Sequence, residues 1–245
     1  MPSFETNPMA ISRLNFCLHL FTPVLSTPMY GAASCLPFTG RNSLAQDKIL
    51  TSPVLDFLLQ RSSTPISAIG EPGPGDDDIQ TMIRAATRVP DHGRLTPWRF
   101  IIYRGMARDE VGQYLAALAE EREGPLSEAR REQELKRFAR APIVIGIISS
   151  PVAHERIPEW EQFLSAGAAA MNLCIAANAL GYATNWVTNW YSSDEKGRTL
   201  LGLAPHERVA GFVHIGTCDL KVPERPRAEL AEIVSEYAGP WREVR

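Results

Sequence analysis

The stretch RVPDHGRLTPWRF, residues 88–100, marks the point where a helical pattern gives way to a strand pattern. It combines three arginines, one histidine, two prolines and a tryptophan. Pro90 disfavours helix at the residue before it, so it ends the preceding helix. A loop this rich in polar side chains is costly to order. Two hypotheses follow: either Arg88 and His92 bind a ligand, or the loop is a structural corner in which Trp98 is core and His92 is solvated.

Apolar spacing on both sides of this loop predicts an alternation of helices and strands. Upstream, Ile79, Met82, Ile83 and Ala86 recur at one-turn spacing, as on a helix with one buried face. Further helices are expected over residues 109–122, 127–140, 159–180, 194–201 and 228–235, with a short one beginning at Ser52-Pro53. Strands are expected over residues 99–103, 143–148, 182–190 and 209–215. The elements alternate irregularly, so the predicted fold class is α+β in one domain.

Two of the expected elements have unusual composition. The run 143–148 is continuously apolar, as in a strand that is buried on both faces. The helix 159–180 is apolar almost all round beyond Gly167, so we expect it in the core and at a subunit contact. By contrast, the mixed charges of residues 127–140 predict a solvated helix face. Trp160 and Trp190 are expected to be packing residues.

Composition limits the function classes. The chain has 245 residues with 44% hydrophobic content, enough for a real core, and its net charge of −3 offers no basic field for nucleic acid. The histidines and cysteines do not cluster at metal-ligand spacing, so no metal site is expected. Cys17 and Cys35 could pair in an oxidising compartment, but scattered reduced thiols in a cytoplasmic protein are the preferred interpretation.

The first fifty residues differ from the rest of the chain, because they lack a steady apolar period. We expect residues 1–50 to be a disordered or extended N-terminal tail, and residues 51–245 to form the folded domain. The apolar run 14–25 is too short to span a bilayer. A signal peptide that uses Arg13 and the sequence around Ala32 to Cys35 is the alternative.

Separated polar segments suggest an anion-binding function. No Gly-x-Gly-x-x-Gly follows a strand, and no phosphate-binding P-loop or Gly-x-Ser-x-Gly turn occurs. Instead, Gln60-Arg61-Ser62 ends the first helix, and the basic segment 221–227 follows the last strand. Arginine binds phosphate through two parallel hydrogen bonds, and a neighbouring hydroxyl adds a neutral donor. Such a clamp suits the phosphate of a flavin mononucleotide, although Arg61 alone would also fit an ordinary surface arginine.

From about Leu55 to Trp241 the sequence resembles the nitroreductase family, in its short single-domain branch. The resemblance rests on the order and spacing of five motifs. They are Gln60-Arg61-Ser62-Ser63; Arg88-Val89-Pro90-Asp91-His92 with Pro97-Trp98-Arg99-Phe100; Trp160-Glu161-Gln162 with Ser165-Ala166-Gly167; Ala179-Leu180-Gly181 before Trp186; and Gly211-Phe212-Val213-His214-Ile215-Gly216-Thr217.

The resemblance implies an α+β fold with a central, mostly antiparallel sheet flanked by helices, in an intertwined homodimer with FMN at the interface. It also implies that NADH or NADPH delivers hydride to the flavin, which passes electrons to nitroaromatics, quinones or similar acceptors in a ping-pong cycle. A non-catalytic flavin-binding or storage protein of the same fold, or another flavin-dependent dehydrogenase or dehalogenase, is the alternative.

The resemblance also implies site residues, carried over by position. The FMN contacts are Gln60, Arg61, Ser62, Arg88, His92, Trp186, Val187, Thr188 and Arg225. Gln60 stands where relatives often have arginine, so Arg225 or Arg227 is a candidate for the missing charge. The nicotinamide-nucleotide region comprises Ala176, Ala177, Asn178, Ala179, Leu180 and Gly181. No general acid or base is expected, because the flavin carries the redox chemistry.

Overall fold

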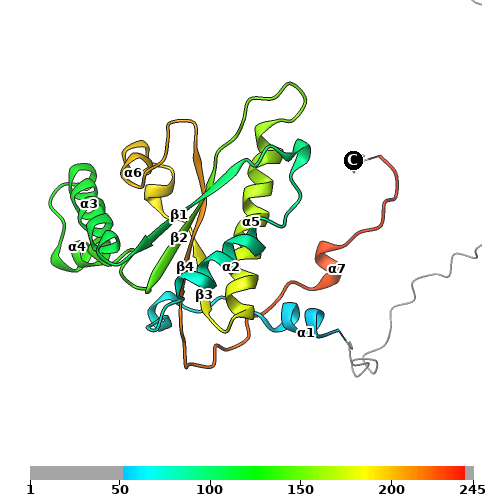
Figure 1. The fold of residues 1–245 in the computed structure, drawn as a ribbon, viewed down its shortest axis with the longest axis horizontal. Helices are drawn as coiled ribbons and strands as arrows, with labels where there is room; N and C mark the ends of the chain where they lie inside the picture. The colour runs from blue at the N-terminus through cyan, green and yellow to red at the C-terminus, as the bar shows by residue number, and fades with distance from the viewer. Residues whose placement is uncertain (1–51, 241–245) are drawn as a thin grey trace, which may run out of the picture. The chain divides into compact units, whose positions relative to one another are not determined.

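The centre of the fold is a four-stranded antiparallel sheet in the order β1-β2-β4-β3 (Figure 1). The computed structural model describes residues 52–240, and the predicted tail, the signal-peptide alternative and Cys17 with Cys35 lie outside the described residues. The strands are β1 (Trp98–Arg104), β2 (Ile143–Ser149), β3 (Ala183–Val187) and β4 (Arg208–Gly216). All three pairings are antiparallel, which confirms the predicted α+β class with a central antiparallel sheet.

Helices cover both faces of this sheet. One face packs against α2 (Asp76–Ala86) and α5 (Glu159–Ala179), and the other against α3 (Met106–Glu123) and its neighbour α4 (Glu128–Leu135) (Figure 1). Every residue of β2 is buried, because alternate side chains enter the two cores. Ile143, Ile145 and Ile147 face α2 and α5, whereas Val144 and Ile148 face the side of α3. The continuous apolar run in the sequence is thereby explained.

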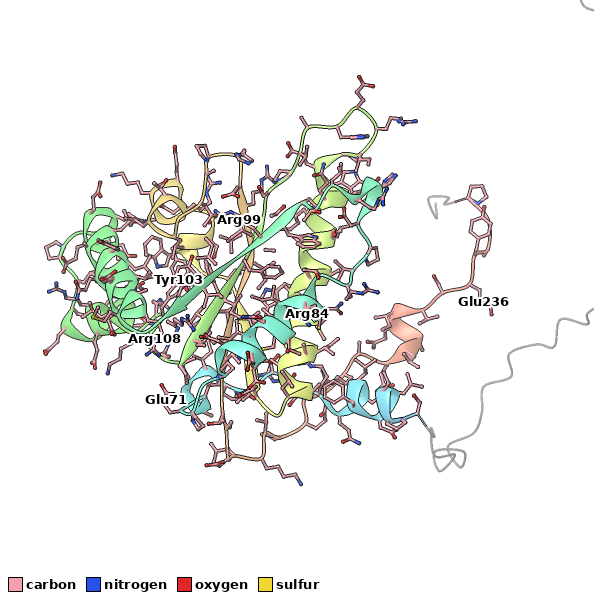
Figure 2. The ribbon with its side chains drawn as sticks, in the orientation of Figure 1. Glu71, Arg84, Arg99, Tyr103, Arg108 and Glu236 are labelled. Carbon is pink, nitrogen blue, oxygen red and sulfur yellow. The ribbon has the colours of Figure 1, made fainter. Side chains whose placement is uncertain are left out.

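The strand β1 is fastened to the loop that precedes β4. Arg99 and Tyr103 lie four residues apart and therefore on the same face of the strand (Figure 2). The Tyr103 hydroxyl donates a hydrogen bond to the Leu201 carbonyl at 2.7 Å. The Arg99 guanidinium donates to both carboxylate oxygens of Glu207, at 2.7 and 2.6 Å. The short helix α6 (Glu195–Leu200) leads into this loop.

Three predicted elements are shorter in the structure than the sequence suggested. The helix expected over residues 127–140 ends at Leu135, because Phe138 turns into the core and is fully buried there. The strand expected over residues 182–190 ends at Val187, because Asn189 caps a turn of 3-10 helix that begins at Trp190. The helix expected over residues 228–235 is reduced to α7 (Leu230–Ile233), which buries no side chain.

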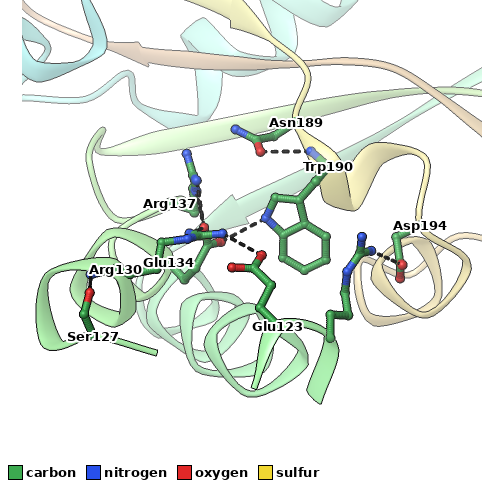
Figure 3. Close-up of polar contacts among 9 residues, drawn as sticks. Glu123, Ser127, Arg130, Glu134, Arg137, Asn189, Trp190 and Asp194 are labelled. Carbon is green, nitrogen blue, oxygen red and sulfur yellow. Dashed lines mark hydrogen bonds and ion pairs between the residues drawn. The ribbon is translucent and has the colours of Figure 1, made fainter. Parts of the chain in front are cut away.

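The charged run in α4 is not simply a solvated face, so that prediction was wrong at one point. Glu134 is 0% exposed and accepts hydrogen bonds from Arg130 and Arg137 (Figure 3). The Trp190 Nε1 group donates to the other carboxylate oxygen at 3.3 Å. Burial alone would raise the pKa of Glu134, but the bonds from the two arginines outweigh it and lower the pKa. A buried carboxylate with three donor residues thus joins α4 to the segment after β3.

Candidate functional site

The end of the first helix opens onto a polar pocket. The helix α1 (Pro53–Gln60) stops at Arg61, whose backbone is extended. Arg61 and Ser62 then lie beside the C-terminal end of α5, where Asn178 and Gly181 complete a cavity of about 340 Å³. The full lining is Phe57, Gln60, Arg61, Ser62, Thr64, Asn178, Gly181, Tyr182, Ala183, Cys218 and Leu220. The predicted phosphate residues and two residues of the predicted nicotinamide region therefore share one pocket.

The polar groups of this pocket suit an anion. Arg61 is its one charged lining residue, and no carboxylate belongs to the lining among residues 52–240. The Arg61 Nε atom is buried and has no hydrogen-bond partner in the described part of the chain. A buried cationic donor of this kind is costly unless an acceptor meets it. The pocket therefore fits the phosphate end of FMN, with Arg61 as the charged donor and Ser62 as a hydroxyl donor.

The loop after α2 lies at the opposite end of α5 (Figure 1). Gly93, Arg94 and Thr96 all have positive φ, at 71°, 54° and 50°. This conformation is strained for the two residues that are not glycine. The Asp91 carboxylate stabilises it by accepting hydrogen bonds from the backbone N–H groups of Leu95 and Thr96, at 3.0 and 2.9 Å. Strained backbone that the surroundings hold in place is typical of ligand-binding loops.

Side chains of α5 hold this loop at several points. The Asn172 amide donates to the Arg88 carbonyl at 3.0 Å, and the Ser165 hydroxyl donates to the Pro90 carbonyl at 2.7 Å. The Trp98 indole N–H donates to the Ser165 hydroxyl at 3.1 Å, so Trp98 helps to shape the loop, as the structural hypothesis expected. His92 itself is exposed and contacts Glu161. Thus the loop has a backbone that hydrogen bonds hold in place, and it also exposes polar side chains such as His92.

The FMN contacts predicted at the end of β3 are Trp186, Val187 and Thr188. Within one chain they lie neither in the pocket at the C-terminal end of α5 nor in the loop of residues 88–98. Trp186 packs on Gly211, where an added Cβ would lie 1.7 Å from the Trp186 Nε1 atom. That Nε1 atom donates to the Ala210 carbonyl at 3.2 Å. Val187 packs against the core on the α3 side, and Thr188 is exposed at the end of the strand. Trp186 is therefore held by the sheet although it is 37% exposed, and Thr188 is the other exposed residue of this segment.

The remaining predicted residues are scattered. Arg88 and Arg225 are exposed and do not line the pocket at the C-terminal end of α5. Arg227, the other candidate for the missing charge, is paired with Glu224. In the predicted nicotinamide region, Ala177 is fully buried in the core, so its side chain does not reach the pocket. Ala176 is partly buried against that core, whereas Ala179 and Leu180 are exposed.

Sequence reasoning missed two carboxylates that organise the loops. Glu207 accepts hydrogen bonds from Arg99 and thereby connects β1 to the loop that precedes β4. Its side chain is only 4% exposed. Glu161 contacts the His92 ring. Glu161 lies within one of the quoted motifs, next to Trp160, so a signal existed, but spacing along the sequence cannot reveal a partner sixty-nine residues away. Within residues 52–240 no group of three or more metal-ligating side chains is found.

Solved structures share this arrangement. A nitroreductase-like family protein from Bacillus cereus superposes with a TM-score of 0.64 at 20% identity, over 77% of this chain and 97% of that one. A nitroreductase with bound FMN from Bacteroides fragilis superposes with a TM-score of 0.59 at 18% identity, over 76% of this chain and all of that one (100%). At these identities the likeness establishes the fold, which is the predicted nitroreductase-like α+β fold.

The sequence itself establishes the family. The pattern of the nitroreductase family matches residues 70–217. The Escherichia coli K12 protein named "Putative NAD(P)H nitroreductase YdjA" is 30% identical over 170 residues, which span 68% of this chain and 89% of that protein. This chain belongs to the nitroreductase family, as its motifs predicted.

Proposed function

We propose that this protein is an FMN-dependent oxidoreductase that uses NADH or NADPH to reduce a nitroaromatic, a quinone or a similar small acceptor in a ping-pong cycle. The observation that carries the proposal is the pocket at the C-terminal end of α5. It gathers Gln60, Arg61 and Ser62, and the buried Arg61 Nε atom has no partner within the described residues. Family membership supplies the redox class.

The side chains of the pocket have a binding role in this proposal. Arg61 neutralises part of the phosphate charge, and its partly buried position strengthens that attraction because the local dielectric is low. Ser62 adds a hydroxyl donor, and Gln60 adds an uncharged amide where an arginine would add a second charge. Asn178 is oriented by bonds from its Nδ2 atom to the Tyr182 carbonyl and the Thr184 hydroxyl, at 2.9 and 3.1 Å. Its carbonyl oxygen is buried and has no hydrogen-bond partner among the described residues.

A homodimer is part of the same proposal, because the two groups of predicted contacts lie at opposite ends of α5. Glu161 and Asn178 are both in this helix, seventeen residues apart, which corresponds to about 25 Å along the axis. In a two-fold dimer with antiparallel α5 helices, the pocket of one subunit would meet the loop of residues 88–98 from its partner. Gln60 to Ser62 and Arg88 with His92 would then share one site.

Exposed apolar side chains support this assembly. The helix α1 buries no side chain, and Leu59 is 65% exposed. On α5, Trp160 is 63% exposed and Leu164 is also exposed, although Trp160 was predicted to pack. The segment after β4 exposes Leu230, Ile233, Val234 and Tyr237. Exposed apolar side chains that gather at an interface are typical of interaction sites, and two extended ends that embrace a second copy would cover these.

Bound FMN would accept hydride and deliver electrons to the acceptor, so the protein supplies binding, orientation and an accessible face. No general acid or base is assigned. Within residues 52–240, no helix is both long enough and apolar enough to cross a membrane. We place the enzyme in the cytoplasm in this proposal, where NADH and NADPH are available.

An Arg61→Ala variant tests the phosphate assignment. It is expected to weaken FMN binding by about 1.5 to 3 kcal/mol, because a charge-assisted hydrogen bond in a partly buried pocket is lost. Fluorescence of FMN released on dilution of the purified protein measures this. Arg84→Ala, an exposed arginine in the last turn of α2, is the matched control and should retain FMN like the wild type. Unchanged FMN retention in Arg61→Ala would show that Arg61 does not hold the phosphate.

The same variant separates a shared site from one contained in a single chain. Heterodimers of one Arg61→Ala chain and one His92→Ala chain, purified after co-expression through a different affinity tag on each chain, carry one site with both defects and one intact site, if the two residues come from different subunits. FMN content should then recover towards half of the wild-type value. If both residues served one chain's site, every site would stay defective and no recovery would occur.

A further inference from the structure

The loop of residues 88–98 is held in place without help from the His92 side chain. Hydrogen bonds from Asn172 and Ser165 on α5 fix the Arg88 and Pro90 carbonyls on one side of it. On the other side, the Asp91 carboxylate holds the backbone at Leu95 and Thr96. The backbone around His92 is therefore anchored on both sides, and a further contact to His92 is not needed for that purpose.

Nevertheless, the His92 ring makes a close contact with α5. Its Nδ1 atom lies 2.8 Å from the Glu161 Oε2 atom. The side chain of His92 is 64% exposed, whereas that of Glu161 is 32% exposed. An exposed pair of this kind adds little to stability. It does restrict the ring, since a side chain with two free torsions now has one preferred orientation.

The contact also decides which ring nitrogen carries the proton. An ionised carboxylate only accepts hydrogen bonds, so the Nδ1 atom must donate. In the neutral ring the Nε2 atom then holds the lone pair. That atom lies on the opposite edge of the ring from Glu161, and it can accept a hydrogen bond from an N–H or O–H group of a bound ligand. The other tautomer could only donate there.

We propose that Glu161 is the positioning residue for His92: it fixes the Nδ1–H tautomer and the ring orientation, so that Nε2 presents an acceptor to a hydroxyl or N–H group of the bound cofactor. This rests on the proposed function, in which His92 contacts FMN. Glu161 itself does not touch the cofactor. Its role parallels that of carboxylates that orient a ligand-binding histidine through the opposite ring nitrogen.

The direct test is nitrogen NMR of the holoprotein labelled with ¹⁵N-histidine, at alkaline pH where histidine side chains are neutral. His92→Gln identifies the His92 signals. In the wild type, Nδ1 should carry the proton. In Glu161→Ala, the Nε2–H form that free histidine favours should dominate. Glu159→Ala, an exposed carboxylate in the same helix, should leave the wild-type pattern unchanged. An unchanged His92 tautomer in Glu161→Ala would overturn the proposal.

A double-mutant cycle supplies the second readout. Glu161→Ala should increase FMN release on dilution by about three- to tenfold in the wild-type background, as expected for the loss of one well-placed hydrogen bond, and should have no further effect in a His92→Ala background. Equal effects in both backgrounds, or a marked fall in melting temperature for Glu161→Ala, would assign Glu161 to the structure instead. The tautomer measurement can also be made on protein without FMN, so it still decides whether Glu161 fixes the His92 tautomer if the protein fails to bind the cofactor.

Discussion

A Glu134→Ala variant is expected to lose about 3 to 5 kcal/mol of unfolding free energy, because it leaves a buried cation and a half-buried indole N–H without their acceptor. Arg137 is the critical partner: its side chain is only 10% exposed and donates to Glu134 at 2.7 and 3.1 Å. Arg130 is nearer the surface and can turn towards water. Urea unfolding at pH 7 measures the loss, with the slope of the transition as a check on two-state behaviour.

The matched control is Glu132→Ala in the same helix. Glu132 pairs with Lys136 at 2.5 Å, but both side chains are mostly exposed. Solvent and salt screen such a pair, so removing it should shift the midpoint far less than Glu134→Ala does. Equal shifts for the two variants would contradict the account, since they would show that burial of Glu134 has no energetic consequence.

A Glu207→Gln variant is expected to lose about 3 kcal/mol at pH 7. Hydrogen bonds from Arg99, opposed by burial, lower the pKa of Glu207 from 4.5 to about 2, with a further contribution from the Ala204 N–H. A lowering of this size corresponds to about 1.4 kcal/mol for each pH unit. Because the folded state holds the ionised form, this stability is present above pH 4.5 and disappears as the pH falls towards 2.

Urea unfolding at pH 7, 5 and 3 checks this dependence. The difference between wild type and Glu207→Gln should be constant from pH 7 to 5 and clearly smaller at pH 3. Glu224→Gln, which breaks an exposed pair with Arg227, serves as the control and should show little difference from wild type at each pH. A difference that persists undiminished at pH 3 would rule out the charge of Glu207 as its source.

The elements were predictable where local pattern and tertiary packing agree. The apolar run of residues 143–148 predicted a strand buried on both faces, and the spacing of Ile79, Met82 and Ala86 predicted that one face of α2 lies in the core, as found. The sequence did not predict where an element ends when contacts with residues far away in the chain determine that end. Nothing in residues 127–140 shows that Phe138 enters the core and stops α4, or that Trp190 approaches Glu134 from the segment after β3.

The candidate site was predictable in part for the same reason. The motif Gln60-Arg61-Ser62 and the helix end at Asn178 could be named from the sequence, but only the fold shows that they line one pocket. Arg88 and His92 lie elsewhere within a single chain, and only the proposed dimer would bring them to that pocket. The pairing of Glu161 with His92 joins a helix to a loop across sixty-nine residues, a distance that no local pattern encodes.

The absorbance spectrum of the purified protein, recorded under argon before and after NADH or NADPH is added, tests the central claim most directly. The account predicts yellow protein with bound FMN, bleaching within the time of a turnover with at least one of the two nucleotides, and return of the colour when a nitroaromatic or quinone is added. Colourless protein that takes up no added FMN would contradict it. Bound FMN that neither nucleotide reduces would instead identify a flavin-storage protein, and would equally refute the proposed oxidoreductase.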